Sequence, residues 1–196
     1  AQNGFGAANK LNNLLMTPLN GLGAAMTSFT AQNLGAGDHA RIRKGTVQAL
    51  IIVWTMCLIS IAAGLLLSRG GGYLYIFLSP DKVTAETMRY GNTYLYVDLS
   101  LYLFLGFIFV VRNCVQGIGK PQFVLGAGAA ELAARVSVLL PPLIAGGAVN
   151  SDAPRAAVYA LCFADPFAWM AADAVLLVPF LRNIMKMDYR YLKGTM

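Results

Sequence analysis

Four ionisable side chains stand inside long stretches of this sequence that are otherwise nearly free of charge. Glu131 and Arg135 lie four residues apart in the stretch 122–147, and Asp165 and Asp173 lie eight apart in the stretch 156–181. On a helix, the members of each pair share nearly one face. An acid and a base on one face can form an ion pair, and two acids on one face indicate a polar interior or a cavity. The chemistry to expect is therefore charge pairing or ion binding.

The stretches that hold these residues are long enough to cross a lipid bilayer. Gly45 to Ser68 contains no charged residue, and a helix needs about 20 mostly apolar residues to cross the hydrocarbon core, whereas a buried helix of a soluble protein stops nearer 10–14. The sequence predicts an all-α integral membrane protein. We expect one membrane domain, residues 1–196, with about five transmembrane helices near 7–34, 46–68, 91–112, 122–147 and 156–181.

The composition agrees with this class and excludes several others. Of the 196 residues 57% are hydrophobic and 12% are charged, with a mean hydropathy of +0.58, whereas about a quarter of a soluble domain is charged. The net charge of +6 is spread along the chain, so we expect membrane lipid and no nucleic acid as a partner. Histidine, cysteine and acidic residues show neither metal-ligand spacing nor a nucleophile with its base. We therefore expect no metal, no cofactor and no enzymatic activity.

Positive charge is distributed unevenly between the two sets of connecting segments. Nine Lys and Arg residues follow the first, third and fifth stretches, and five occupy the opposite set. The positive-inside rule then places the loop 38–45 and the C-terminus in the cytoplasm. In that loop, the Gly35–Asp38 segment should end the first helix, and Asp38 should cap the second. The segment 74–80 is too short to cross, and we expect an interfacial segment with Tyr73 and Tyr75 as aromatic anchors.

Each ionisable residue inside a membrane stretch is a functional hypothesis, because its burial in lipid is unfavourable. Glu131 and Arg135 fit a structural ion pair as well as a role in ion coupling, and we favour the structural pair. Asp165 is followed by Pro166, which frees a backbone carbonyl as in helices that line cavities. We expect Asp165 to line a polar interior or cavity together with Asp173. Asp98 lies nearer the outer end of its stretch, so we expect it to reach toward water.

Several motifs, in the same order along the chain, resemble the MATE (multidrug and toxic compound extrusion) transporter family. The first resembles the helix end and basic cytoplasmic loop of that family, the second its Arg-Asn-x-x-Gln-Gly-x-Gly-Lys-Pro loop, and two more resemble later stretches. The residues that carry the resemblance are Gln32, Asn33, Gly35, Ala36 and Gly37, then Arg112, Gln116 and Gly117 within Arg112–Pro121, then Glu131 and Arg135, and finally Asp165, Pro166 and Trp169.

The resemblance implies a multi-pass protein of the plasma (inner) membrane that exports small organic, often cationic, compounds in exchange for H⁺ or Na⁺. The family fold has twelve helices in two six-helix lobes. This chain would supply the last five helices of the C-terminal lobe, and its partners would be the N-terminal lobe and the missing first helix. A start at AQNGF without Met agrees with a fragment. A piece of the N-terminal lobe is an alternative, since the two halves resemble each other.

Two other functions stay open at this point. A flippase for lipid-linked precursors belongs to the same broad superfamily, but Arg135 is the only basic residue deep inside a stretch, and a pyrophosphate would need a strongly cationic cavity. A non-transporting scaffold would explain the small-residue helices and leave the intramembrane acids unexplained. Some family members bind a cation through an acid on the third helix, at a position near Leu105, and this role does not carry over to Asp98.

Overall fold

The chain folds into helices that run side by side. The computed structural model describes residues 2–145 and 155–186, except for the side chains of residues 142, 143, 145 and 155–159. Every long element among these residues is an α-helix, which confirms the predicted all-α class. In chain order they are α1 (Gln2–Gly35), α2 (His39–Ser68), η1 (Arg69–Gly71), α3 (Gly72–Phe77), η2 (Pro80–Lys82), α4 (Ala85–Ser100), α5 (Tyr102–Gly117), α6 (Pro121–Ala145), α7 (Arg155–Pro179) and η3 (Phe180–Ile184).

The described helices include several that can cross a membrane. Three are long and apolar enough, and they cover His39–Phe77, Pro121–Pro141 and Ala160–Ile184; α4 and α5 together make a fourth candidate, a broken span. The chain is therefore an all-α membrane protein. Helix α1 does not qualify by composition because its first half is rich in Asn, so the interpretation with five spans stays a prediction.

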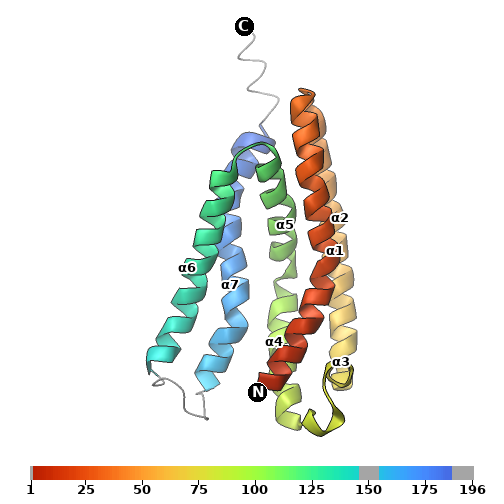
Figure 1. The fold of residues 1–196 in the computed structure, drawn as a ribbon, viewed down its shortest axis with the longest axis vertical. Coiled ribbons are helices and arrows are strands. Elements are labelled where there is room, and N and C mark those ends of the chain that lie inside the picture. Colours follow the sequence, from red (N-terminus) through yellow and green to blue (C-terminus); the bar gives the residue numbers. More distant parts are fainter. Residues whose placement is uncertain (1, 146–154, 187–196) are drawn as a thin grey trace.

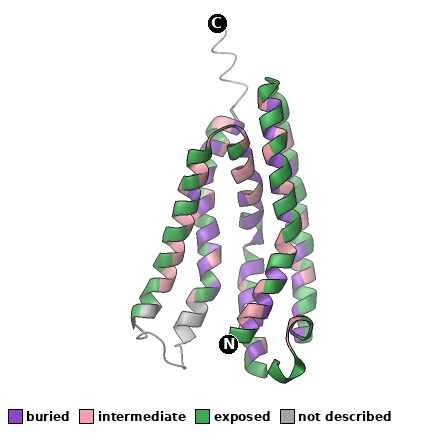
Figure 2. Cartoon of the chain, viewed as in Figure 1, coloured by how far each residue is buried: buried purple, intermediate pink, exposed green. Residues whose placement is uncertain are grey.

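Two antiparallel hairpins flank the broken helix (Figure 1). Helices α1 and α2 form one hairpin, α6 and α7 form the other, and α4 and α5 lie between them. Helix α1 packs on α2, α4 and α5, whereas α6 packs mainly on α7. The burial of the residues follows this packing. Figure 2 shows that buried residues concentrate along α5 and on the sides of the helices that face it, whereas α6 is largely exposed.

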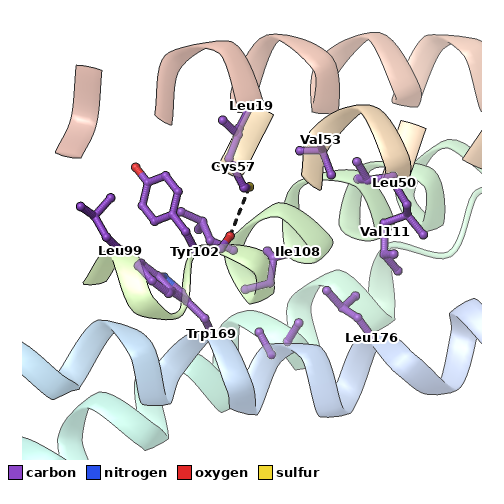
Figure 3. Close-up of a cluster of buried hydrophobic side chains, with 14 of the residues drawn as sticks. Leu19, Leu50, Val53, Cys57, Leu99, Tyr102, Ile108, Val111, Trp169 and Leu176 are labelled. Atoms are coloured by element: carbon purple, nitrogen blue, oxygen red, sulfur yellow. Dashed lines mark hydrogen bonds between the residues drawn. The ribbon is translucent and has the colours of Figure 1, made fainter. Parts of the chain in front are cut away.

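The core around the start of α5 combines two aromatic rings with a cysteine and branched aliphatic side chains (Figure 3). The rings of Tyr102 on α5 and Trp169 on α7 meet edge to face, with centroids 6.3 Å apart. On the other side, the Cys57 thiol on α2 donates to the Tyr102 carbonyl oxygen at 3.3 Å. The start of α5 therefore joins α2 to α7.

The turn between α1 and α2 forms as predicted. Helix α1 ends at Gly35, and Gly37 adopts a left-handed conformation with φ of 72°, which glycine reaches without steric strain. The Asp38 carboxylate then accepts a hydrogen bond from the Arg41 backbone N–H at 2.9 Å. Asp38 thus caps α2.

The third predicted span is not one continuous helix. Leu101 leaves the helical conformation, with φ of −112° and ψ of 15°, and the axes of α4 and α5 differ by 54°. Side chains of α2 hold the start of α5 in place: besides Cys57, the Trp54 indole donates to the Leu103 carbonyl oxygen at 3.2 Å. The break falls at a leucine and not at a proline or glycine, so the sequence carries no signal for it at this position.

The short segment before α4 differs in part from the predicted interfacial anchor. It forms the six-residue helix α3 after Gly70 and Gly71, both left-handed. The Tyr75 side chain is exposed, whereas Tyr73 is completely buried. The prediction that Tyr73 anchors the segment at the membrane surface was therefore wrong, since the ring packs into the protein.

We expect the two ends of the bundle to face opposite sides of the membrane. Figure 1 places the connection from α1 to α2 at one end and the segment from η1 to η2 at the other. Cysteines introduced at Ala40 and Ser79, both exposed, should therefore react from opposite sides, Ala40→Cys from the cytoplasm. The measurement is labelling of intact cells with an impermeant maleimide, with the buried native cysteines as background. Labelling of both sites from outside would overturn the orientation.

Gly117 allows α1 and α5 to approach closely. A Cβ atom at this position would lie 2.6 Å from the Thr27 carbonyl oxygen, whereas one at Gly35 would meet nothing within 4 Å. We expect Gly117→Ala to reduce the free energy of unfolding by roughly 1–3 kcal/mol through overpacking. Thermal unfolding in detergent measures the effect, and Gly35→Ala is the matched control. Equal melting temperatures for both variants would contradict the role assigned to Gly117.

Candidate functional site: charged and polar clusters between the helices

Four charged side chains form a network across three helices. Arg112 on α5 pairs with Glu131 on α6. Glu131 also accepts from Arg135, one turn along α6, with the Arg135 Nη1 and Glu131 Oε2 atoms 3.5 Å apart. Arg135 Nε then donates to Asp165 Oδ1 on α7 at 3.0 Å. Two acids and two bases thus alternate from α5 through α6 to α7.

The Glu131 carboxylate is the hub of this network. It contacts both arginines, and its side chain is only 15% exposed, compared with 28% for Arg112 and 36% for Arg135. An ion pair away from water is stable only when its partners stay paired. The favoured interpretation of Glu131 and Arg135 as a structural pair agrees with this geometry. The sequence did not reveal that Arg112 and Asp165 complete it, because their contacts join separate helices.

Asp98 occupies a second polar cluster, which the sequence analysis missed. Its side chain is fully buried, and its Oδ2 atom accepts from the Asn12 amide on α1 at 2.7 Å. The Tyr102 hydroxyl, just past the helix break, donates to Asn12 Oδ1 at 2.7 Å. The prediction that Asp98 reaches toward water was therefore wrong: α1 covers it. Asn12 is one of several asparagines in the first half of α1, so the sequence did not single it out.

The Asp98 carboxylate lacks a compensating cation in the described part of the chain. None of the ion pairs there includes it, and its Oδ1 atom has no hydrogen-bond partner. Tyr94 on α4 forms a hydrogen bond with the carboxylate, and the charge of Asp165 on α7 acts on it. A buried carboxylate next to a second acid is unfavourable in its charged form. The charged form of Asp98 is therefore unfavourable unless a positive charge accompanies it.

Asp173 takes part in none of the ion pairs of this network, although the charges of Arg112 and Glu131 act on it. It lines an open groove of about 620 Å³ between α2, α5 and α7, whose other lining residues are apolar or aromatic, among them Trp54, Phe107 and Met170. Its Oδ1 atom is buried without a hydrogen-bond partner among the described residues. The shared face expected for Asp165 and Asp173 therefore leads to two surroundings, a salt bridge for Asp165 and an apolar groove for Asp173.

Helix α1 presents a polar stripe on its outer side. Asn13, Thr17 and Asn20 are exposed and lie on one helical face. Their side chains bond only within α1: Asn13 donates to Asn9 at 2.7 Å, and Thr17 and Asn20 donate to backbone oxygens one turn earlier. Contact between such a polar stripe and lipid is unfavourable, so the stripe is suited to contact with water, a solute or another polar protein surface.

The remaining residues of the sequence motifs lie near helix ends or, for Pro166, inside α7. Gln32 is exposed, and the Asn33 amide donates to the Phe29 carbonyl oxygen at 2.7 Å. Helix α7 continues through Pro166, which is buried. Gln116 is exposed next to the last residue of α5. Gln32, Asn33 and Gln116 therefore lie near helix ends, and Pro166 lies inside α7. Among the described residues, no three His, Cys, Asp or Glu side chains gather as metal ligands.

Removal of the Glu131 charge should destabilise the protein more than removal of the Asp165 charge. Glu131→Gln leaves two arginines without their shared partner, whereas Asp165→Asn leaves Arg135 still paired. We expect Glu131→Gln to lower the free energy of unfolding by about 2–3 kcal/mol, less than for a fully buried pair because the arginines are partly exposed. Thermal unfolding in detergent measures the order, and exposed Glu86→Gln is the control. A larger effect from Asp165→Asn would show that Glu131 is not the hub.

Comparison with known proteins identifies the family. The MatE family model matches residues 3–138, a range from α1 into α6 that includes Asn12, Asp98, Arg112 and Glu131. The match ends before α7, so Asp165 and Asp173 lie beyond it. No curated protein and no solved structure matches the chain. Because the family model covers more than half of the sequence, the protein belongs to the MatE family, whose members are transporters of the MATE superfamily.

Proposed function

We propose that the chain is part of a secondary active exporter of the plasma membrane, which moves small organic cations out of the cell in exchange for H⁺ or Na⁺. Two lobes would expose a central site alternately to each side of the membrane, with the second lobe supplied by chain outside these residues. The observation that carries the proposal is the Asp98 cluster, a fully buried carboxylate that no described cation neutralises.

Asp98 is suited to the coupling ion. A carboxylate inside a membrane protein is expected to pair with another group or to mark an ion pathway. Here its partners among the described residues are neutral, the Asn12 amide and the Tyr94 hydroxyl. The C-terminal end of α4 lies two residues further on, at a helix break. The carbonyl ends of broken helices favour cations. Either a proton or a sodium ion satisfies these requirements.

Helix α1 connects the Asp98 cluster with the polar stripe. Asn12 binds Asp98 on the inner side of α1, and its neighbour Asn13 belongs to the stripe on the outer side. A cation at Asp98 would change the charge that Asn12 faces and therefore the force that holds α1 against α4. Coupling requires a difference of this kind between two states. In this proposal the stripe faces the transport pathway between the lobes.

The groove at Asp173 supports an organic cation as the exported substrate. Its walls are apolar and aromatic, and Asp173, which lines it, has one buried carboxylate oxygen without a hydrogen-bond partner among the described residues. Aromatic faces and a carboxylate together favour a cation with an apolar body. The alternative of a lipid-precursor flippase is less well supported, because Arg135 is already paired with Glu131 and Asp165 and so offers little charge to a pyrophosphate.

Neutralising Asp98 should uncouple export from the ion gradient. We expect Asp98→Asn to retain folding, because an asparagine can still accept from Asn12, and to reduce gradient-driven efflux by about tenfold or more. The measurement is efflux of a cationic dye from cells that produce the protein from its intact gene, with the H⁺ and Na⁺ gradients collapsed separately. Substrate binding to the purified variant should be unchanged.

The control for this experiment is Asp81→Asn, which removes an exposed acid at the outer end and should leave efflux intact. Asp165→Asn and Asp173→Asn are measured in parallel. Normal efflux by Asp98→Asn, with loss in one of the other two, would move the coupling role to that residue. Normal efflux by all three would place the coupling ion outside this chain.

A further inference from the structure

A groove at the α1–α2 end of the bundle carries two positive side chains. It has a volume of about 430 Å³, and its lining includes Phe29 on α1 and Arg41, Lys44 and Gln48 on α2. The Phe29 ring lies against Gly45, where an added Cβ would meet the ring at 2.4 Å. The groove therefore combines an aromatic wall on one side with cations on the other.

Both cations are available to a ligand. Arg41 and Lys44 are exposed, and neither takes part in an ion pair with another described residue. Asp38 also lines the groove, but its carboxylate accepts from the Arg41 backbone N–H as the cap of α2. With Arg43 nearby, basic residues outnumber acidic ones at this end of α2. An anion is the ligand that this charge favours.

The same face of α2 continues as an apolar surface. Arg41, Lys44 and Gln48 follow helical spacing, and Ile51 and Leu58 extend the row toward the middle of the helix. The Ile51 and Leu58 side chains are each 59% exposed. Along one line, the surface thus presents two cations, an amide and then aliphatic side chains. A free phosphate ion would use only the first part of this row.

We propose that an anionic phospholipid binds to this face, with its phosphate between Arg41 and Lys44 and an acyl chain along Ile51 and Leu58. The charge of the groove matches the headgroup, and the order of polar and apolar side chains matches the order of headgroup and acyl chain. The positive-inside rule places this end at the cytoplasmic leaflet, where basic residues attract anionic lipids. The proposal concerns a lipid site and holds whatever substrate is exported.

The test compares lipid binding to purified protein variants. Native mass spectrometry of the detergent-solubilised protein, titrated with phosphatidylglycerol or phosphatidylcholine, gives the affinity for each lipid, and the melting temperature with each lipid is the second readout. The variant Arg41→Gln with Lys44→Gln removes both cations. The matched control, Arg69→Gln with Lys82→Gln, removes two exposed cations from the opposite end. If the double variant fails to fold, the two single variants replace it.

We expect the wild type and the control to bind phosphatidylglycerol about tenfold more tightly than the groove variant does. Phosphatidylcholine should bind all three equally and more weakly. Equal affinity of the groove variant for phosphatidylglycerol would overturn the proposal. Equal binding of both lipids by the wild type would show that the apolar row acts alone, and displacement of the lipid by millimolar inorganic phosphate would identify a soluble anion as the ligand; either result rejects the phospholipid site.

Discussion

Inside the hydrocarbon core of a membrane, a charged side chain has no water to solvate it, and its partners must come from the protein. This constraint explains the packing of α5, α6 and α7. Helix α6 packs mainly on α7 and has few contacts with the rest of the bundle, yet the chain from Arg112 through Glu131 and Arg135 to Asp165 ties it to both neighbours. Apolar packing is weakly directional in lipid, whereas alternating charges fix which face of each helix turns inward.

Two acids inside the predicted spans, Asp98 and Asp173, are not part of this chain of ion pairs, and their surroundings differ. Asp98 meets neutral partners in a closed position under α1, and Asp173 meets apolar side chains at an open groove. A transporter needs one position that an ion can occupy and another that a solute can reach. The structure separates these two environments by α5, whose first residue Tyr102 contacts the Asp98 cluster through Asn12. The proposed exporter uses both environments.

Some of this arrangement could be predicted from the sequence, and the reason is local periodicity. The uncharged stretch from Gly45 to Ser68 falls within one helix, and Gly37 and Asp38 form the expected turn. The pairing of Glu131 with Arg135 followed from their spacing of four residues. The burial of Asp98 could not be predicted in this way. Its partner Asn12 lies 86 residues away in the sequence, and Tyr102, the other partner of Asn12, lies 90 residues from Asn12, and a single sequence records no distance between helices. The break at Leu101 also depends on contacts with α2, which no local pattern encodes.

Because α4 is one continuous helix from Ala85 to the break at Leu101, a change of angle at the break displaces its far end. With a rise of 1.5 Å per residue, the 16 residues of α4 reach about 24 Å from the break. A change of 10° in the 54° angle between α4 and α5 would therefore displace the far end near Ala85 by about 4 Å. The break lies within one turn of both Asp98 and Tyr102. A small change in this angle, such as one caused by an ion that binds at Asp98, would therefore move the far end of α4 by about the width of a side chain.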